Sequence, residues 1–326
     1  MSVDNILLHI FSKDLRLHDN TALYFLKKQI EKVRESQIEE PSPIKVGFVY
    51  FIDQDYLTKV LNYGKLRYAV LGSALEDLAK NLQKLNSDLF VTYEPTAKSL
   101  RYLANQFKIN RLLFNTNSED KWLGFERCLF QGAPVDTYLS GFTNTTCNYS
   151  NIIQKNNSMV PLVHQDFVRL IQDDQEVLLK VKPSFDTILR KSEQIEIEKN
   201  PAFERFSIMK FKKILDLNEN IYKHLPKSCG ETAGLTLHKK IMETCKPYTE
   251  ISIYQSLGTI SPRVQFHAMR DEIDYIRANL KDVDDDLELN ISGSDQTRLD
   301  FYQEYVVRLL WREFFKCSST YWKLRL

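Results

Sequence analysis

The sequence predicts an α/β protein in which an N-terminal Rossmann-like domain, built on a parallel sheet, precedes an all-helical domain. Three observations lead to this prediction. Short apolar runs alternate with helical patterns early in the chain, helical spacing dominates after residue 203, and 326 residues exceed the usual length of one domain. Short strands separated by helices are typical of a parallel sheet with right-handed crossovers.

The elements of the first domain alternate along the chain. Short β-rich runs predict buried strands, and apolar residues at helical spacing predict the helices between them. The expected strands are Ile6–Phe11, Lys45–Phe51, Asp88–Tyr93 and Arg111–Asn115, and the expected helices are Thr21–Arg34, Arg67–Leu85 and Ala97–Phe107. We place this domain at residues 1–140.

The pattern breaks down over residues 141–202, which we interpret as an interdomain connection on the surface. Asn, Ser, Gln and Lys dominate this stretch, and Pro161 and Pro183 interrupt it. Beyond it, helical periodicity returns without a strand pattern of comparable strength, so we predict an all-helical second domain at residues 203–326. Its expected helices are Phe211–Leu217, Gly230–Thr244, Pro262–Leu280 and Gln296–Phe315.

Composition narrows the class of protein. The chain has 44 Lys and Arg against 43 Asp and Glu, so its net charge of +1 argues against nucleic-acid binding driven by overall charge. The 5 cysteines are scattered without a CxxC, which indicates reduced thiols. No signal peptide and no run of about 18 apolar residues is present. We therefore expect an intracellular protein, cytoplasmic or nuclear, with no membrane segment.

Several common chemical signatures are absent from the sequence. Neither GxGxxG nor GxxxxGKS/T follows a predicted strand, so a ligand on the sheet would be held by side chains at the carboxyl edge of the strands. The 6 histidines show no metal-ligand spacing, and we expect no metal site. No carboxylate pair suggests general acid–base chemistry, and we assign no catalytic residue.

One face of the last predicted helix combines an aromatic ring with two arginines. Arg308, Trp311, Arg312 and Phe315 are spaced at i, i+3, i+4 and i+7, which places them on one side of a helix. These side chains suit a ligand that carries phosphates or a flat heteroaromatic ring. The alternative is an amphipathic core helix in which Glu304 pairs with Arg308. The residues alone leave both interpretations open.

The segment after the first strand resembles the opening signature of the photolyase/cryptochrome family. That signature usually contains Asp-Leu-Arg-Leu-x-Asp-Asn. The matching residues in this chain are Asp14, Arg16, Asp19 and Asn20. Physically, the segment is a strand-to-helix turn in which Asp19 or Asn20 is available as a helix N-cap.

The segment Thr249–Arg263 resembles the flavin-diphosphate loop of the same family, and it is most similar to the cryptochrome DASH branch. The resemblance implies that Thr249 and Ser252 contact the diphosphate of FAD, as small hydroxyl residues at a helix start do in phosphate sites. Glu250 stands where a basic residue is common. On the residues alone, the hydroxyl groups are equally consistent with simple helix caps.

The last predicted helix is similar to the family's Trp-Arg-Glu/Asp-Phe-Phe motif, and Gly230–Ala233 resembles the start of another family helix. The resemblance implies that Arg312 contacts the flavin and that Trp311 stacks on an extruded DNA base. Arg308 occupies the position of a glutamate that normally helps to hold damaged pyrimidines, and we group it with the DNA-binding residues. A Glu-Arg pair implies that Glu126 contacts an antenna chromophore.

Together these resemblances imply a cryptochrome/photolyase-like flavoprotein with an antenna-type first domain and a partial FAD-binding domain. The implied cofactors are FAD and a methenyltetrahydrofolate antenna, and the implied partner is damaged or single-stranded DNA. The implied function is blue-light reception or light-driven repair of cyclobutane pyrimidine dimers, the reaction of a deoxyribodipyrimidine photolyase. Only the first part of a full family member is matched, so we expect a C-terminal truncation. The alternatives are a truncated relative that binds nucleic acid or protein without photochemistry, and an unrelated nucleotide-binding α/β protein.

Overall fold

The computed structural model describes residues 5–36, 44–60, 63–107, 109–116, 137–142, 144–172, 177–223, 225–281 and 293–324. Within these ranges the chain forms two compact units, each assembled from separate stretches of sequence. Unit 1 comprises the described parts of residues 1–143, 182–234 and 252–260, and unit 2 comprises those of residues 144–181, 235–251 and 261–326. The three domain ranges expected from the sequence divide the chain differently, and they stay a prediction.

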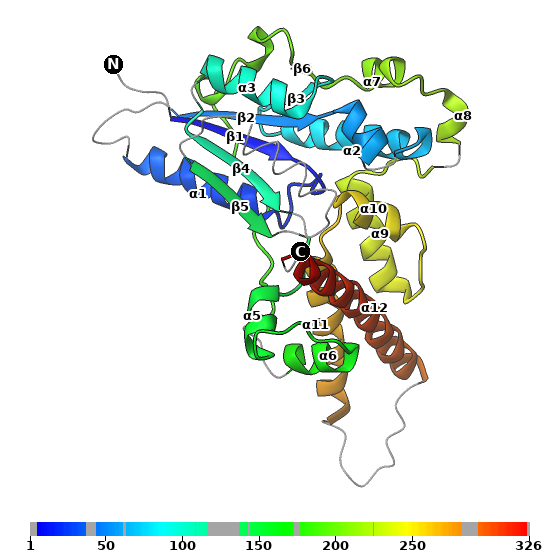
Figure 1. The fold of residues 1–326 in the computed structure, drawn as a ribbon. Coiled ribbons are helices and arrows are strands. Elements are labelled where there is room, and N and C mark those ends of the chain that lie inside the picture. Colours follow the sequence, from blue (N-terminus) through cyan, green and yellow to red (C-terminus); the bar gives the residue numbers. More distant parts are fainter. Residues whose placement is uncertain are drawn as a thin grey trace. The chain divides into compact units, whose positions relative to one another are not determined.

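Unit 1 is built on a six-stranded sheet with the strand order β5-β4-β1-β2-β3-β6. Strands β1 to β5 run parallel (Figure 1). Strand β6 is antiparallel to β3. The strands are β1 (Asn5–Phe11), β2 (Ile44–Phe51), β3 (Leu89–Thr92), β4 (Arg111–Thr116), β5 (Thr137–Phe142) and β6 (Glu204–Arg205). The parallel sheet confirms the predicted α/β fold class.

The helices of unit 1 surround strands that are buried on both faces. Ile10, Val49 and Val91 are fully buried, as expected for the centre of a parallel sheet. The helical segments are α1 (Thr21–Ser36), η1 (Tyr56–Val60), α2 (Lys65–Gln83), α3 (Thr96–Phe107), η3 (Lys191–Glu193), η4 (Ile197–Lys199), α7 (Ile208–Ile214) and α8 (Glu219–Tyr222). Helices α1 to α3 and strands β1 to β4 agree with the predicted elements to within a few residues.

Strands β5 and β6 were not predicted. β5 lies at the edge of the sheet, where it pairs with β4. β6 is two residues long and forms only through its pairing with β3, in which Arg205 faces Phe90 and Glu204 faces Val91. The start of the range 203–326 therefore contributes a strand as well as helices. A two-residue strand carries no periodicity from which it could be predicted.

Unit 2 is built from helices. It contains α5 (Tyr149–Lys155), α6 (His164–Gln172), α11 (Pro262–Lys281) and α12 (Gly293–Leu324), while α9 (Glu231–Thr244) and α10 (Ile251–Leu257) belong partly to each unit. Its core gathers aliphatic and aromatic side chains, including Ile152, Phe167, Ile171, Phe266, Met269, Tyr302 and Leu309. Among the helices that the structure describes, none combines the length and apolarity needed to cross a membrane.

The segment 141–202 contains more regular structure than its polar composition predicts. Helices α5 and α6 lie within it, and Ile152 and Phe167 are fully buried in the core of unit 2. These helices are only 7 and 9 residues long, so each presents few apolar positions. Such a short pattern does not stand out from a polar background, and tertiary packing stabilises the helices instead.

Candidate functional site

The predicted ligand face of α12 lies on the solvent side of the helix. Trp311 is 42% exposed and Phe315 is 62% exposed, and Arg308 is exposed as well. The opposite face packs into the core of unit 2 through Tyr302, Tyr305, Leu309, Leu310, Phe314 and Cys317. The helix is therefore amphipathic, and three of the four residues predicted to share a face are accessible together.

Arg312, the fourth of these residues, is half-buried and anchored by a neighbouring carboxylate. Its Nη1 donates to Glu313 Oε1 at 2.5 Å, and its Nη2 donates to the carbonyl oxygen of Asn144 at 3.2 Å. Glu313 is fully buried and also accepts from the backbone N–H of Thr146 and the hydroxyl of Tyr149, both at 2.9 Å. A buried carboxylate is tolerated when it is paired and hydrogen-bonded in this way. The network therefore fixes the position of the guanidinium.

The sequence-based predictions gave no role to Glu313. Its partners Thr146 and Tyr149 lie 167 and 164 residues away along the chain, so no local pattern points to them. Burial raises the pKa of the Tyr149 hydroxyl well above its ordinary value, and the nearby Glu313 carboxylate raises it further. Tyr149 therefore remains a hydrogen-bond donor at any physiological pH.

Trp311 stacks on a histidine from α6. The ring centroids of Trp311 and His164 are 3.8 Å apart with an interplanar angle of 3°, and the Phe315 ring lies 5.6 Å from the indole at 28°. Burial lowers the pKa of His164, and its Nε2 is buried without a hydrogen-bond partner among the described residues. A neutral imidazole is thus placed flat against the indole and restricts its orientation.

Arg308 forms the ion pair that its spacing predicts. Its Nη2 lies 2.6 Å from Glu304 Oε1, and both side chains are more than half exposed, at 61% and 64%. Exposed pairs of this kind contribute about 0–1 kcal/mol to stability. The pair therefore competes only weakly with an incoming anion.

The segment that resembles a flavin-diphosphate loop contains a helix, α10, that was not predicted. Thr249 lies two residues before α10 and Ser252 lies in its first turn, and both are exposed. Ser261 Oγ accepts from the backbone N–H groups of Arg263 at 3.1 Å and Val264 at 3.4 Å, which makes it the N-cap of α11. Ser261 is thus a helix cap, and both interpretations of the Thr249 and Ser252 hydroxyls stay open.

The residues of the opening signature are buried in unit 1. Asp14 accepts from the side-chain amides of Asn115 at 2.5 Å and Asn20 at 3.2 Å, and burial raises the pKa of its carboxyl group. Arg16 is fully buried and donates to the carbonyl oxygen of Gly258 at 2.6 Å. Gly258 has a φ of 66°, a left-handed conformation that favours glycine. In this chain the signature therefore holds the turn after β1 against the end of α10.

Glu231 fixes the same turn to the start of α9. Its carboxylate accepts from the backbone N–H groups of Leu17 and His18, both at 2.8 Å, and lies 2.5 Å from His18 Nδ1. Burial opposes ionisation, but the hydrogen bond and charge of His18 together with the two backbone N–H groups lower the pKa of Glu231. The preceding residue, Gly230, has no space for a side chain, because a Cβ added there would lie 2.1 Å from the Cβ of Asp77.

Two further expectations from the sequence concern an antenna chromophore and a metal ion. Glu126, the residue implied to contact an antenna, lies outside the described residues, and its role stays a prediction. Within the part of the chain that the structure describes, no cluster of three or more His, Cys, Asp or Glu side chains is arranged to hold a metal ion.

Residues 7–183 match the family model of DNA photolyase. The chain belongs to the DNA photolyase family. The resemblance drawn from the signature segments is thereby confirmed, and the assignment to the DASH branch stays a prediction. Among curated relatives, Cryptochrome-1 of Erithacus rubecula is 26% identical over 96% of this chain and 48% of its own length. Cryptochrome-1 of Macaca fascicularis is 25% identical over 96% of this chain and 50% of its own length.

Solved photolyase-family structures share the fold. The archaeal photolyase of Sulfolobus tokodaii, solved with two FAD molecules, has a TM-score of 0.63 at 15% identity and matches 97% of this chain and 60% of its own. The Synechocystis cryptochrome has a TM-score of 0.62 at 18% identity over 97% of this chain and 61% of its own. The chain spans about half the length of the curated relatives it matches.

Proposed function

We propose that this photolyase-family chain binds FAD and acts in blue light, either in the repair of cyclobutane pyrimidine dimers or as a photoreceptor. The observation that carries the proposal is the family match over residues 7–183. FAD, when bound, would supply light absorption and electron transfer. The residues of this chain would bind the cofactor and orient the DNA.

The side chains assigned to FAD fit a group that carries a diphosphate and a polar ring. A guanidinium has five N–H donors, and the contacts of Arg312 with Glu313 and Asn144 use two of them. The remaining donors are available for a flavin oxygen, while Glu313 holds the guanidinium in place. Thr249 and Ser252 are exposed residues, and their hydroxyl groups would donate to the diphosphate. The exposed carboxylate of Glu250 lies between them in sequence and weakens anion binding.

The DNA-binding part of the proposal rests on the exposed end of α12. Trp311 is 42% exposed and would stack on an extruded base, and stacking on an aromatic side chain contributes about 1–3 kcal/mol per base. Arg308 would exchange its weak pair with Glu304 for a DNA phosphate. The proposed partner is therefore damaged or single-stranded DNA.

For the methenyltetrahydrofolate antenna, the support is the resemblance at Glu126 alone.

Flavin binding is tested by titrating the purified protein with FAD and following flavin fluorescence and the blue absorption band. We expect saturable binding that is weakened by about tenfold or more in Arg312→Gln, because a charge-assisted hydrogen bond is lost. Arg308→Gln is the matched control on the same helix and should bind FAD as the wild type does. A protein that stays colourless after reconstitution contradicts the flavin assignment.

Photochemistry is tested on the FAD-loaded protein with ultraviolet-irradiated oligothymidylate. Repair predicts loss of dimers in blue light and none in the dark, measured by chromatography of the oligonucleotide. Photoreduction of the flavin without dimer loss would favour a photoreceptor. Salt-dependent DNA binding that needs neither flavin nor light would favour the alternative of a nucleic-acid-binding module.

A further inference from the structure

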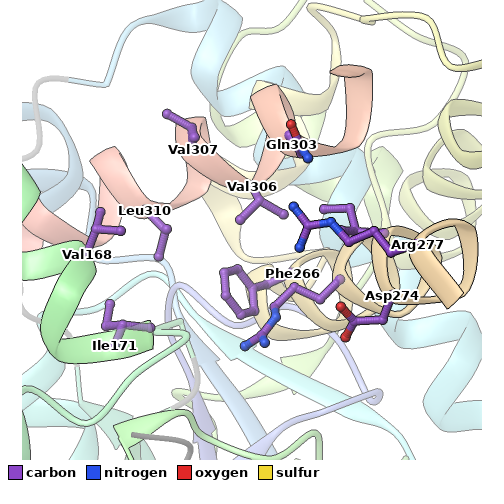
Figure 2. Close-up of a pocket in the computed structure, with 11 residues that line it drawn as sticks. Val168, Ile171, Phe266, Asp274, Arg277, Gln303, Val306, Val307 and Leu310 are labelled. Carbon is purple, nitrogen blue, oxygen red and sulfur yellow. The ribbon is translucent and has the colours of Figure 1, made fainter. Parts of the chain in front are cut away.

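A groove in unit 2 lies between helices α6, α11 and α12 and has a volume of about 320 Å³. Its walls are apolar: Val168 and Ile171 come from α6, Phe266 from α11, and Val306 and Leu310 from α12 (Figure 2). Ligand pockets in proteins measure roughly 300–1,000 Å³ and are lined mainly by such side chains. The described residues assigned to FAD or DNA do not line this groove, so it is a separate feature of the fold.

Two arginines of α11 also line the groove. Arg270 and Arg277 are seven residues apart and therefore lie on the same side of the helix. The Arg270 guanidinium lies 5.9 Å from the centre of the Phe266 ring, and Figure 2 shows the Arg277 side chain extending from α11 toward Val306. Within the described chain, neither arginine forms an ion pair, although Asp274 lies between them in sequence.

The arginines of the neighbouring helix are different in this respect. Arg298, Arg308 and Arg312 of α12 each form an ion pair with a carboxylate, at distances of 2.9, 2.6 and 2.5 Å. Arg270 and Arg277 thus differ from these three arginines of α12, because neither has a carboxylate partner among the described residues. Guanidinium groups beside an apolar wall are well suited to bind an anion whose remaining atoms are apolar.

The lining also restricts the ligand. Two guanidinium groups and the Asp274 carboxylate leave a net charge of +1, which favours a ligand with a single negative charge. The other polar lining side chain is Gln303, so a sugar or nucleotide would lose hydrogen bonds to water without replacing them. We propose that the groove binds an apolar ligand that carries one carboxylate, of the fatty-acid type, and that Arg270 and Arg277 bind the carboxylate.

The test uses isothermal titration of the full chain with decanoate, and with decanol as the neutral ligand of the same length. We expect saturable binding of decanoate that is about tenfold or more tighter than that of decanol, because the charge-assisted hydrogen bonds are available only to the anion. Combining Arg270→Gln with Arg277→Gln should abolish that difference and leave decanol binding unchanged. Val306→Trp should fill the groove and weaken the binding of both ligands.

Arg308→Gln is the matched control, because it removes a paired arginine of α12 outside the groove and should bind decanoate like the wild type. Far-UV circular dichroism establishes that each variant remains folded. The proposal is overturned if decanoate does not bind saturably, if decanol binds equally well, or if the double variant keeps the wild-type affinity for decanoate. Because the titration uses flavin-free protein, none of these results depends on the proposed flavin function.

Discussion

Because of His9 in β1, unit 1 should lose stability as the pH falls below 6.5, which is above the pH at which ordinary carboxylates titrate. Its side chain is fully buried, and the centroid of its ring lies 4.4 Å from that of Phe11 and 6.2 Å from that of Phe48. Within the described parts of the chain, neither ring nitrogen has a hydrogen-bond partner. Burial lowers the pKa of His9 from its ordinary value of 6.5 to about 3. The folded protein therefore excludes a proton that the unfolded chain binds at mildly acidic pH.

The sign and size of the effect follow from that difference in pKa. Above pH 6.5 the ring is neutral in both states, and His9 has no proton-linked effect on folding. As the pH falls from 6.5 toward 3, the unfolded state binds the proton and stability decreases by about 1.4 kcal/mol per pH unit. Between pH 7 and pH 5 the expected loss is about 2 kcal/mol. Below about pH 3 both states are protonated and the loss stops growing.

The assay is urea unfolding at pH 7, 6 and 5, monitored by far-UV circular dichroism, for the wild type and His9→Leu. The quantity compared is the difference in free energy of unfolding between the two proteins, because other groups titrate equally in both. At pH 7 the variant should lie within about 1 kcal/mol of the wild type, because lost ring contacts are offset by removal of unsatisfied ring nitrogens. At pH 5 it should have gained about 2 kcal/mol relative to the wild type.

A second histidine variant provides the control. His267 belongs to unit 2, where its Nε2 lies 2.9 Å from the carbonyl oxygen of Leu179, whereas His9 belongs to unit 1. His267→Gln keeps His9 and should therefore retain the His9-dependent loss of about 2 kcal/mol between pH 7 and pH 5. If the wild type and His9→Leu lose stability in parallel between pH 7 and pH 5, the inference that His9 stays neutral in the fold is wrong.

Three further substitutions, together with Gly64→Ala as a control, test the packing and electrostatics of the fold by chemical denaturation. Gly230→Ala should destabilise by roughly 1–3 kcal/mol, because the added Cβ would lie 2.1 Å from the Cβ of Asp77; Gly64→Ala, with no atom within 4 Å of the added Cβ, should not. Glu231→Gln should cost about 1–3 kcal/mol, because a charged acceptor for two buried backbone N–H groups is lost, and a change below about 0.5 kcal/mol would contradict this role. Arg308→Gln should change stability by less than about 1 kcal/mol, and a larger loss would show that the exposed pair is not weak.

The residues of the candidate site were predictable to the extent that helical spacing determines which side chains share a face. Spacing placed Arg308, Trp311 and Phe315 on one side of α12, and all three are exposed. It also predicted the pair between Arg308 and Glu304. The stack of Trp311 on His164 was not predictable, because the two residues lie on different helices and meet only when α6 packs on α12.

The opening signature shows why a motif can be recognised correctly while its physical role is missed. Asp14, Arg16 and Asn20 match the family pattern, and the match led to the correct family. In the fold, the Asp14 carboxylate accepts a hydrogen bond from Asn115. Arg16 donates to the carbonyl oxygen of Gly258, which lies 242 residues away along the chain. A single sequence contains no information on partners at that separation.

The sequence by itself determined the elements whose pattern is local. Strands β1 to β4 and helices α1 to α3 could be predicted because buried apolar runs and helical periodicity are properties of neighbouring residues. The tertiary structure alone decided β6, the helices α5 and α6, and the burial of Glu313 among partners more than 160 residues away. These features depend on backbone pairing and packing between distant segments, whose free energy is gained only when the segments meet.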